Sequence, residues 1–168
     1  MDPQRKADIA DWWEGGFPGG CFCVKPLEHR LRHAFERVLE QLPAEAFAAF
    51  LAVEPTVVCP AGASANLFIL RAVVPPSEQP QEALVTVMYF DPTAATRKSD
   101  AALLNTVAHE VAHVVLAHHR AGWNPFHRNS DDEEAADRLL ESWGFKRRYT
   151  KGQLQKMRDE ERRLKGTE

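Results

Sequence analysis

The feature that most constrains the fold is an apolar-periodic segment from Ala101 to Ala121, which contains neither glycine nor proline. Such a segment predicts a helix, and Ser99 is suited to cap its N-terminus. Within it the chain reads His109-Glu110-Val111-Ala112-His113. Because residues four apart share a helical face, both imidazoles are aimed at a common point, with a carboxylate one residue further round. The pattern is typical of a zinc site with a general base beside it, and it indicates a metal-dependent hydrolase.

A second, acidic segment offers the best third ligand, because a catalytic zinc ion usually has three protein ligands and a water. Residues 131–137 read Asp-Asp-Glu-Glu-Ala-Ala-Asp and begin a predicted helix, 131–143. Glu133 and Asp137 lie four apart at the edge of its apolar face, where their charges need compensation. A zinc ion for Glu133 and an imidazole N–H for Asp137 would supply it.

The helical phase separates Glu133 from its neighbour. Glu134 lies about 100° further round the helix, on the polar side, where it can pair with Arg138. A capping box that joins Ser130 to Glu133 is the competing interpretation, because this motif is common at helix starts. The upstream histidine pair favours ligation.

The remaining periodicities predict an α+β domain. We expect a small three-stranded, mostly antiparallel sheet packed on an N-terminal helix and the H-E-x-x-H helix, with a second ligand helix and a charged C-terminal helix. The helical patterns outside the two ligand helices span 27–42, 44–52 and 150–164, and the strand patterns span 56–59, 66–74 and 83–90.

Glycine content and charge suggest three parts of the chain. Residues 1–25 are interpreted as an irregular N-terminal arm that Trp12 and Trp13 pin to the body or to a partner. Residues 26–145 form a single zinc metallopeptidase-like domain. Residues 146–168, with nine Lys or Arg and four Asp or Glu, form a basic C-terminal helix or tail. Such a tail can touch nucleic acid, but a solvated amphipathic helix is the favoured interpretation.

The cysteines and the apolar runs indicate the cellular compartment of the protein. Cys21, Cys23 and Cys59 are a sparse, odd-numbered set, the N-terminus has no basic-then-apolar targeting pattern, and no apolar run is long enough to span a bilayer. We therefore expect a cytoplasmic protein in a reducing compartment, with no disulfide framework and no membrane partner.

The two motifs together resemble a known class of peptidases. H-E-x-x-H at 109–113 followed by E-x-x-x-D at 133–137 resembles the gluzincin pattern of thermolysin-like peptidases. The short layout is similar to the compact minigluzincins, to ImmA/IrrE-type peptidases and to the catalytic core of HtpX-type membrane peptidases. The resemblance covers roughly residues 56–145. It implies one catalytic zinc ion bound by His109, His113 and Glu133.

The resemblance also implies roles beyond metal ligation. Glu110 would be the general base, and Asp137 would orient a ligand histidine. The transmembrane helices of the membrane-type relatives have no counterpart in the sequence, and no DNA-binding helix-turn-helix is evident. No oxyanion-stabilising residue can be matched, and His127 and Tyr149 are the candidates.

Two other histidines are alternative third ligands. His127 could serve as in SprT-like, DNA-associated peptidases, which would leave Glu133 and Asp137 unexplained. His119 lies where metzincins have their third histidine, but Leu116 stands where that family has a turning glycine. His118 is interpreted as a buried or capping residue near the end of the helix.

The sequence as a whole predicts a zinc-dependent peptidase that hydrolyses peptide bonds with a zinc-activated water and Glu110 as general base. Its partner would be a protein or peptide substrate, lying as an added strand along 66–74 or 83–90. The alternatives are the SprT-like protease with His127 as ligand, and a non-catalytic zinc-binding interaction module that acts through the tryptophan arm or the basic tail.

Overall fold

Helices make up most of the fold in a computed structural model of the chain. It describes residues 2–15, 20–23, 25–59, 66–74, 81–118 and 129–165. These residues form helices α1 (Pro3–Glu14), α2 (Lys25–Gln41), α3 (Ala44–Leu51), α4 (Pro92–Arg97), α5 (Asp100–Val115), α6 (Ser130–Ser142) and α7 (Lys151–Lys165). They also form strands β1 (Cys21–Phe22), β2 (Thr56–Val58), β3 (Asn66–Val74) and β4 (Gln81–Tyr89).

The four strands form one mixed sheet in the order β1-β2-β4-β3. β1 and β2 pair in parallel, as do β2 and β4, and only β3 and β4 are antiparallel. The prediction of an α+β domain with a three-stranded, mostly antiparallel sheet is therefore wrong: the chain is mainly helical and most strand pairings are parallel. β4 lies inside the sheet, so of the two strands expected to be free for peptide addition only β3 is at an edge.

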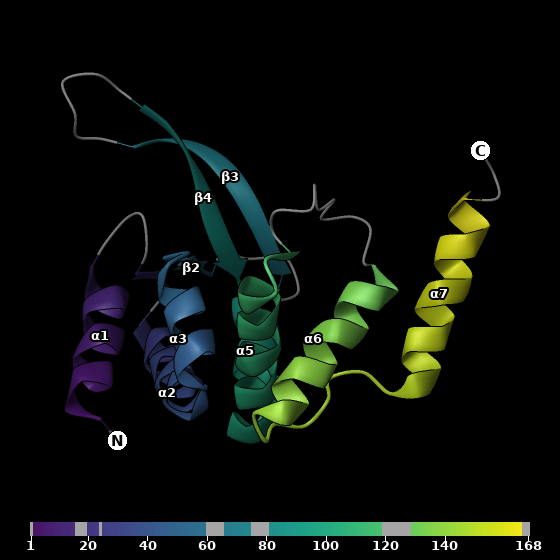
Figure 1. Cartoon of the computed structure of the whole chain (residues 1–168), viewed down its shortest axis with the longest axis horizontal. Coiled ribbons are helices and arrows are strands. Elements are labelled where there is room, and N and C mark those ends of the chain that lie inside the picture. The colour runs from purple at the N-terminus through teal and green to yellow at the C-terminus, as the bar shows by residue number, and fades with distance from the viewer. Residues whose placement is uncertain are drawn as a thin grey trace.

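Helix α5 lies at the centre of the molecule (Figure 1), in contact with α2, α3, α6 and β3. Ser99 caps it as predicted, because its side chain accepts a hydrogen bond from the Ala102 N–H at 3.3 Å. Every residue from Thr106 to Val114 is buried. A helix that is buried on all sides can carry polar groups only where they find partners, so its histidines and glutamate must be paired.

The N-terminal region contains a regular helix, so the interpretation of residues 1–25 as an irregular arm is wrong. The Asp2 side chain caps α1 by accepting from the Gln4 N–H, and proline occupies the first turn. Trp12 and Trp13 are both buried, and they pack on Phe35. The tryptophans thus hold α1 against the body.

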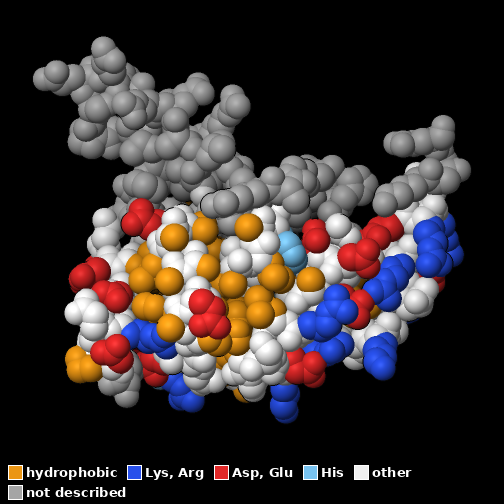
Figure 2. All heavy atoms as spheres, in the orientation of Figure 1, with side chains coloured by type: hydrophobic (Ala, Val, Ile, Leu, Met, Phe, Trp, Pro, Cys, Tyr) orange, Lys and Arg blue, Asp and Glu red, His pale blue; other side chains and the backbone are white. Residues whose placement is uncertain are grey.

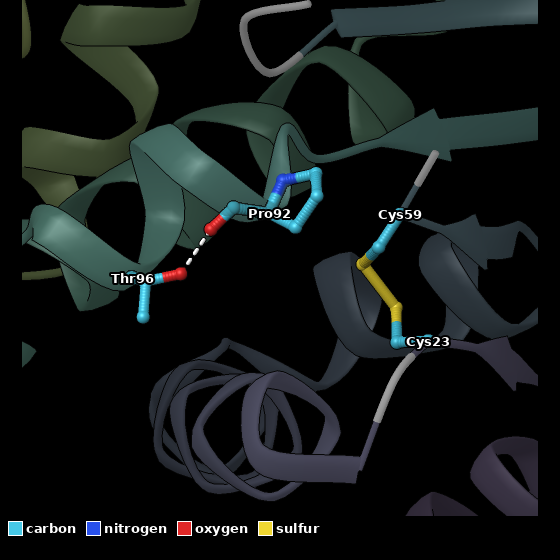
Figure 3. The surroundings of a disulfide bond; sticks show 4 residues. All are labelled: Cys23, Cys59, Pro92 and Thr96. Atoms are coloured by element: carbon cyan, nitrogen blue, oxygen red, sulfur yellow. Dashed lines mark hydrogen bonds between the residues drawn. A yellow bond between two sulfur atoms is a disulfide. The ribbon is translucent and has the colours of Figure 1, made fainter. Parts of the chain in front are cut away.

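A disulfide joins Cys23, after β1, to Cys59, after β2 (Figure 3). The expectation of a chain without disulfides is wrong, because the parallel pairing of β1 with β2 brings together two cysteines that are 36 residues apart. Cys21 is a free thiol, and burial raises its pKa to about 12, with a further contribution from the charge of Glu28. None of the described helices is long and apolar enough to cross a membrane.

The predicted charged C-terminal helix is present as α7, which contacts α6 at the far end of the molecule from α1 (Figure 1). Lys and Arg side chains gather along it, with acidic side chains between them (Figure 2). The Glu161 carboxylate accepts hydrogen bonds from the backbone N–H and the hydroxyl of Ser130, at 2.6 and 2.9 Å. Arg158 of α7 pairs with Glu134. These contacts join α7 to the first turns of α6.

Candidate metal centre

Three side chains from two helices converge at the contact between α5 and α6. His109 and His113 lie one turn apart on α5, and Glu133 reaches them from the first turn of α6. The His109 Nε2 atom lies 2.8 Å from the Glu133 Oε2 atom and 3.1 Å from the His113 Nε2 atom. His113 Nε2 and Glu133 Oε2 are 3.6 Å apart. One ligand atom from each residue therefore lies within 4.8 Å of the others.

The separations of these atoms fit a tetrahedral metal ion. In a tetrahedral zinc site with bonds near 2.1 Å, neighbouring ligand atoms are about 3.4 Å apart. The three observed distances of 2.8, 3.1 and 3.6 Å lie on either side of that value. Two imidazole nitrogens and one carboxylate oxygen are also a donor set that zinc accepts, and that Mg²⁺ and Ca²⁺ do not favour. The side chains present thus fit a divalent transition-metal ion such as zinc.

Asp137, one turn after Glu133, orients the first histidine. Its Oδ1 atom accepts from His109 Nδ1 at 3.0 Å, which leaves the Nε2 atom of His109 facing Glu133. The same carboxylate accepts from the backbone N–H groups of Arg148 and Tyr149, both at 2.9 Å. Asp137 therefore holds both the His109 ring and the turn that follows α6.

The charges at the centre favour binding of a positive charge between these side chains. Burial alone would raise the pKa of Glu133, but the interactions of its carboxylate with the His109 and His113 imidazoles hold that pKa well below its usual range. Burial alone would lower the pKa of His109, but its hydrogen bonds with Asp137 and Glu133 outweigh that effect and raise it. A buried and a partly buried carboxylate facing one imidazole form an arrangement that a proton or a metal cation stabilises.

The structure excludes one of the two interpretations of Glu133, the capping box. Asn129, not Ser130, caps α6, because its side chain accepts from the Asp131 N–H at 3.0 Å. Ser130 is engaged with Glu161 of α7. The Glu133 carboxylate contacts the histidines instead of the start of its own helix, so the capping box does not form.

The prediction that Glu134 faces away from the histidines and pairs with Arg138 is confirmed. Glu134 points to the other side of α6, where it pairs with Arg138 at 3.6 Å and with Arg158 of α7. It lies outside the ligand cluster.

Glu110, the expected general base, has a partner that the sequence did not suggest. Its side chain is 4% exposed, and its Oε1 atom lies 2.5 Å from Nη1 of Arg148, whose side chain is 19% exposed. Burial alone would lower the pKa of Arg148, but the nearby acidic groups, with Glu110 the largest contributor, together outweigh burial and raise the pKa. Burial of Lys98 and, second, the nearby charge of Arg148 lower the pKa of Lys98. The carboxylate is thus held in a buried ion pair.

The other histidines and tyrosine named from the sequence have different outcomes. The Tyr149 ring packs edge-on against the His109 ring, with centroids 5.6 Å apart, which places it beside the cluster. A role for Tyr149 in stabilising an oxyanion stays a prediction. His119 and His127 lie outside the described residues. His118 is partly buried and contacts His113.

Sequence reasoning did not name Arg148, and it interpreted His118 as a buried or capping residue rather than as a neighbour of His113. Both follow the ends of helices, where no periodicity predicts the direction of a side chain. The one available signal for Arg148 was the buried Glu110, since a carboxylate on an apolar helix requires a cation or donors.

Comparison with known proteins finds no relative of the chain. The chain matches no protein-family model, no curated protein and no solved structure.

Proposed function

We propose that the protein is a zinc-dependent peptidase of the compact gluzincin type. The observation that carries the proposal is the convergence of His109, His113 and Glu133, with ligand atoms within 4.8 Å of one another, where α6 meets the helix that also carries the buried Glu110. This combination is the requirement of metal-assisted hydrolysis: three protein ligands and a carboxylate beside them. The resemblance of the two motifs to gluzincins supports the same function.

The roles of the side chains follow from their positions. Bound zinc would supply a Lewis acid that acidifies water and polarises the scissile carbonyl. Glu110 accepts a proton from the attacking water and delivers it to the leaving amine as the C–O bond forms and the C–N bond breaks. Arg148 fixes the position of the Glu110 carboxylate, and Asp137 fixes the ring of His109.

The proposed substrate is an extended segment of a protein or peptide. β3 is an edge strand and contacts α5, so a peptide added beside β3 would run close to the helix that carries the histidines. Main-chain pairing with an edge strand is a common mode of peptide recognition. The proposal includes neither a membrane nor a nucleic acid as partner.

The test is a comparison of two glutamine variants after loading with zinc. Glu110→Gln should retain zinc and lose roughly 10²- to 10⁴-fold in the rate of peptide-bond cleavage, since only the proton acceptor is removed. Glu134→Gln makes the same chemical change on the outer face of α6 and should retain both properties. New N-termini in an unfolded protein mixture, read by mass spectrometry, report cleavage. Cleavage by Glu110→Gln at the wild-type rate would rule out the assigned base.

A non-catalytic zinc-binding interaction module is the second candidate. The observation that favours it is the ion pair between Glu110 and Arg148, which already engages the carboxylate that a peptidase needs. In that case wild type and Glu110→Gln would bind zinc equally and neither would cleave any polypeptide.

The compartment is a separate part of the proposal. The sequence predicts the cytoplasm, whereas the disulfide between Cys23 and Cys59 favours an oxidising compartment. The thiol content of the isolated protein separates the two.

A further inference from the structure

The backbone at the end of α5 takes an unusual course. The helix ends at Val115, Leu116 is its C-cap, and Ala117 has φ of 56°. A left-handed conformation is common for glycine but disfavoured for alanine, because the Cβ atom approaches the carbonyl oxygen. Such conformations persist where the surrounding structure requires them, and they cluster at functional sites.

The consequence of this turn is the position of His118. On a continued helix His118 would lie about 140° around the axis from His113 and could not face it. The turn at Ala117 instead brings the two rings together, with their Nδ1 atoms 2.7 Å apart and their centroids 5.0 Å apart.

The geometry of the cluster indicates which ring nitrogen of each histidine carries a hydrogen atom. The His113 Nε2 atom faces His109 Nε2 at 3.1 Å and the Glu133 carboxylate at 3.6 Å, so this nitrogen is the one available to a metal ion. A neutral imidazole that presents a lone pair on Nε2 carries its hydrogen on Nδ1. The His113 Nδ1–H group therefore donates to the Nδ1 atom of His118.

A carboxylate on α6 matches the other nitrogen of His118. An imidazole that accepts at Nδ1 carries its own hydrogen on Nε2. The Nε2 atom of His118 lies 3.7 Å from Oδ1 of Asp132, and the two side chains are 14% and 30% exposed. Asp132 immediately precedes Glu133, so one of these adjacent residues of α6 lies near His118 and the other near His113.

We propose that His118 is a positioning residue for the metal ligand His113, from whose Nδ1–H group it accepts a hydrogen bond, and that the nearby charge of Asp132 favours the Nε2–H tautomer of His118. The inference rests on the proposed metal site. His118 then acts on His113 as Asp137 acts on His109, and α6 orients both histidines of α5. Partners of this kind fix the ring and raise the basicity of a ligand, and their loss typically weakens metal binding by about 10- to 100-fold.

The test compares zinc affinities of the full-length protein by competition with a chromophoric chelator. His118→Phe keeps a ring but removes the acceptor, and it should weaken zinc binding by about 10- to 100-fold. His118→Asn places its Oδ1 atom near the position of the lost Nδ1 and should stay within about threefold of wild type. His33→Phe, a change at an exposed histidine of α2, is the matched control and should change nothing.

A spectroscopic readout separates positioning from a structural role. In the zinc-loaded, ¹⁵N-labelled protein the His113 Nδ1–H proton should exchange slowly in wild type and in His118→Asn, and rapidly in His118→Phe. Asp132→Asn, a change at a half-exposed residue that keeps the helix intact, should cause a smaller loss of affinity in the same direction.

Two results would overturn the inference while leaving the metal site in place. One is zinc affinity of His118→Phe and Asp132→Asn within twofold of wild type. The other is a loss of affinity in His118→Phe that His118→Asn shares in full, with slow exchange of the His113 proton unchanged. Wild-type protein that binds no zinc would instead remove the proposed function itself, and the positioning role with it.

Discussion

At the scale of single residues, the contact between Glu110 and Arg148 joins two segments that are 38 residues apart. Removing two charges from water costs several kcal/mol, and their attraction offsets that cost only when the geometry is good. Here the separation is 2.5 Å, and the backbone of Arg148 is itself fixed by Asp137. The position of the expected base thus depends on the turn between α6 and α7 as well as on α5.

A double-mutant cycle measures this pair. Arg148→Ala leaves a buried carboxylate without its partner and should lower the free energy of unfolding by about 3 kcal/mol or more. Combined with Glu110→Gln, which removes the charge, the same change should cost clearly less, with a coupling of about 1 to 3 kcal/mol. Urea unfolding of the four proteins, monitored by tryptophan fluorescence, gives the values. Strict additivity would contradict a direct interaction between the two charges.

The convergence of His109, His113 and Glu133 could be predicted from the sequence because helical geometry relates these residues. His109 and His113 share a face through their spacing, and the phase of α6 turns Glu133 inward and Glu134 outward. Arg148 and His118 could not be predicted in the same way. Their directions depend on non-helical turns, and the turn at Ala117 uses a backbone conformation that its residue type does not favour.

At the scale of secondary-structure elements, α1 shows how a local signal can be outweighed. Asp2 followed by Pro3 is a typical helix start, and the structure uses both residues in that way. The glycines and prolines that follow the helix suggested an irregular arm instead. The helix forms because burial of the tryptophans against α2 and α3 stabilises a segment whose own sequence is only weakly amphipathic.

The two tryptophans of α1 should respond differently to the same change. The Trp12 indole N–H donates to the Pro55 carbonyl at 3.1 Å, whereas the Trp13 indole N–H finds no partner among the described residues. Trp12→Phe loses a hydrogen bond as well as ring contacts and should cost about 2 kcal/mol. Trp13→Phe also removes an unsatisfied donor and should cost about 1 kcal/mol or less. Thermal unfolding compares them, and an equal or reversed order would contradict this account.

The strands were predictable as segments but not as a sheet. The patterns at 56–59, 66–74 and 83–90 correspond to β2, β3 and β4 within two residues at each end. Their pairing depends on segments distant in the chain: β2 pairs in parallel with β1 and with β4 rather than with its neighbour β3. Local alternation of apolar residues indicates a strand and carries no information on parallel partners.

At the scale of the whole molecule, two connections hold distant parts of the chain together. The disulfide ties the end of β1 to the end of β2 and so fastens the N-terminal helix region to the sheet. The candidate metal centre joins α5 to α6, and α7 is attached through α6. Neither the disulfide pairing nor the turn contacts of the site follow from local sequence, because both depend on the folded topology.

Reduction of the disulfide should destabilise the protein. Loop-closure entropy for a separation of 36 residues corresponds to about 4 kcal/mol in the chain-entropy model. The isolated protein should show one reactive thiol, that of Cys21, after denaturation without reductant, and three after reduction. Three thiols before reduction, with stability unaffected by reductant, would contradict the disulfide and would favour the cytoplasm instead.

The account as a whole depends on one claim, that α5 and α6 together hold a zinc ion. The direct measurement is the zinc content of the tag-free protein after reconstitution and dialysis, for wild type, Glu133→Ala and Glu134→Ala. The account predicts one zinc ion per chain in wild type and in Glu134→Ala, and its loss in Glu133→Ala. A wild-type protein without zinc, or a Glu133→Ala variant that retains as much as wild type, would contradict it.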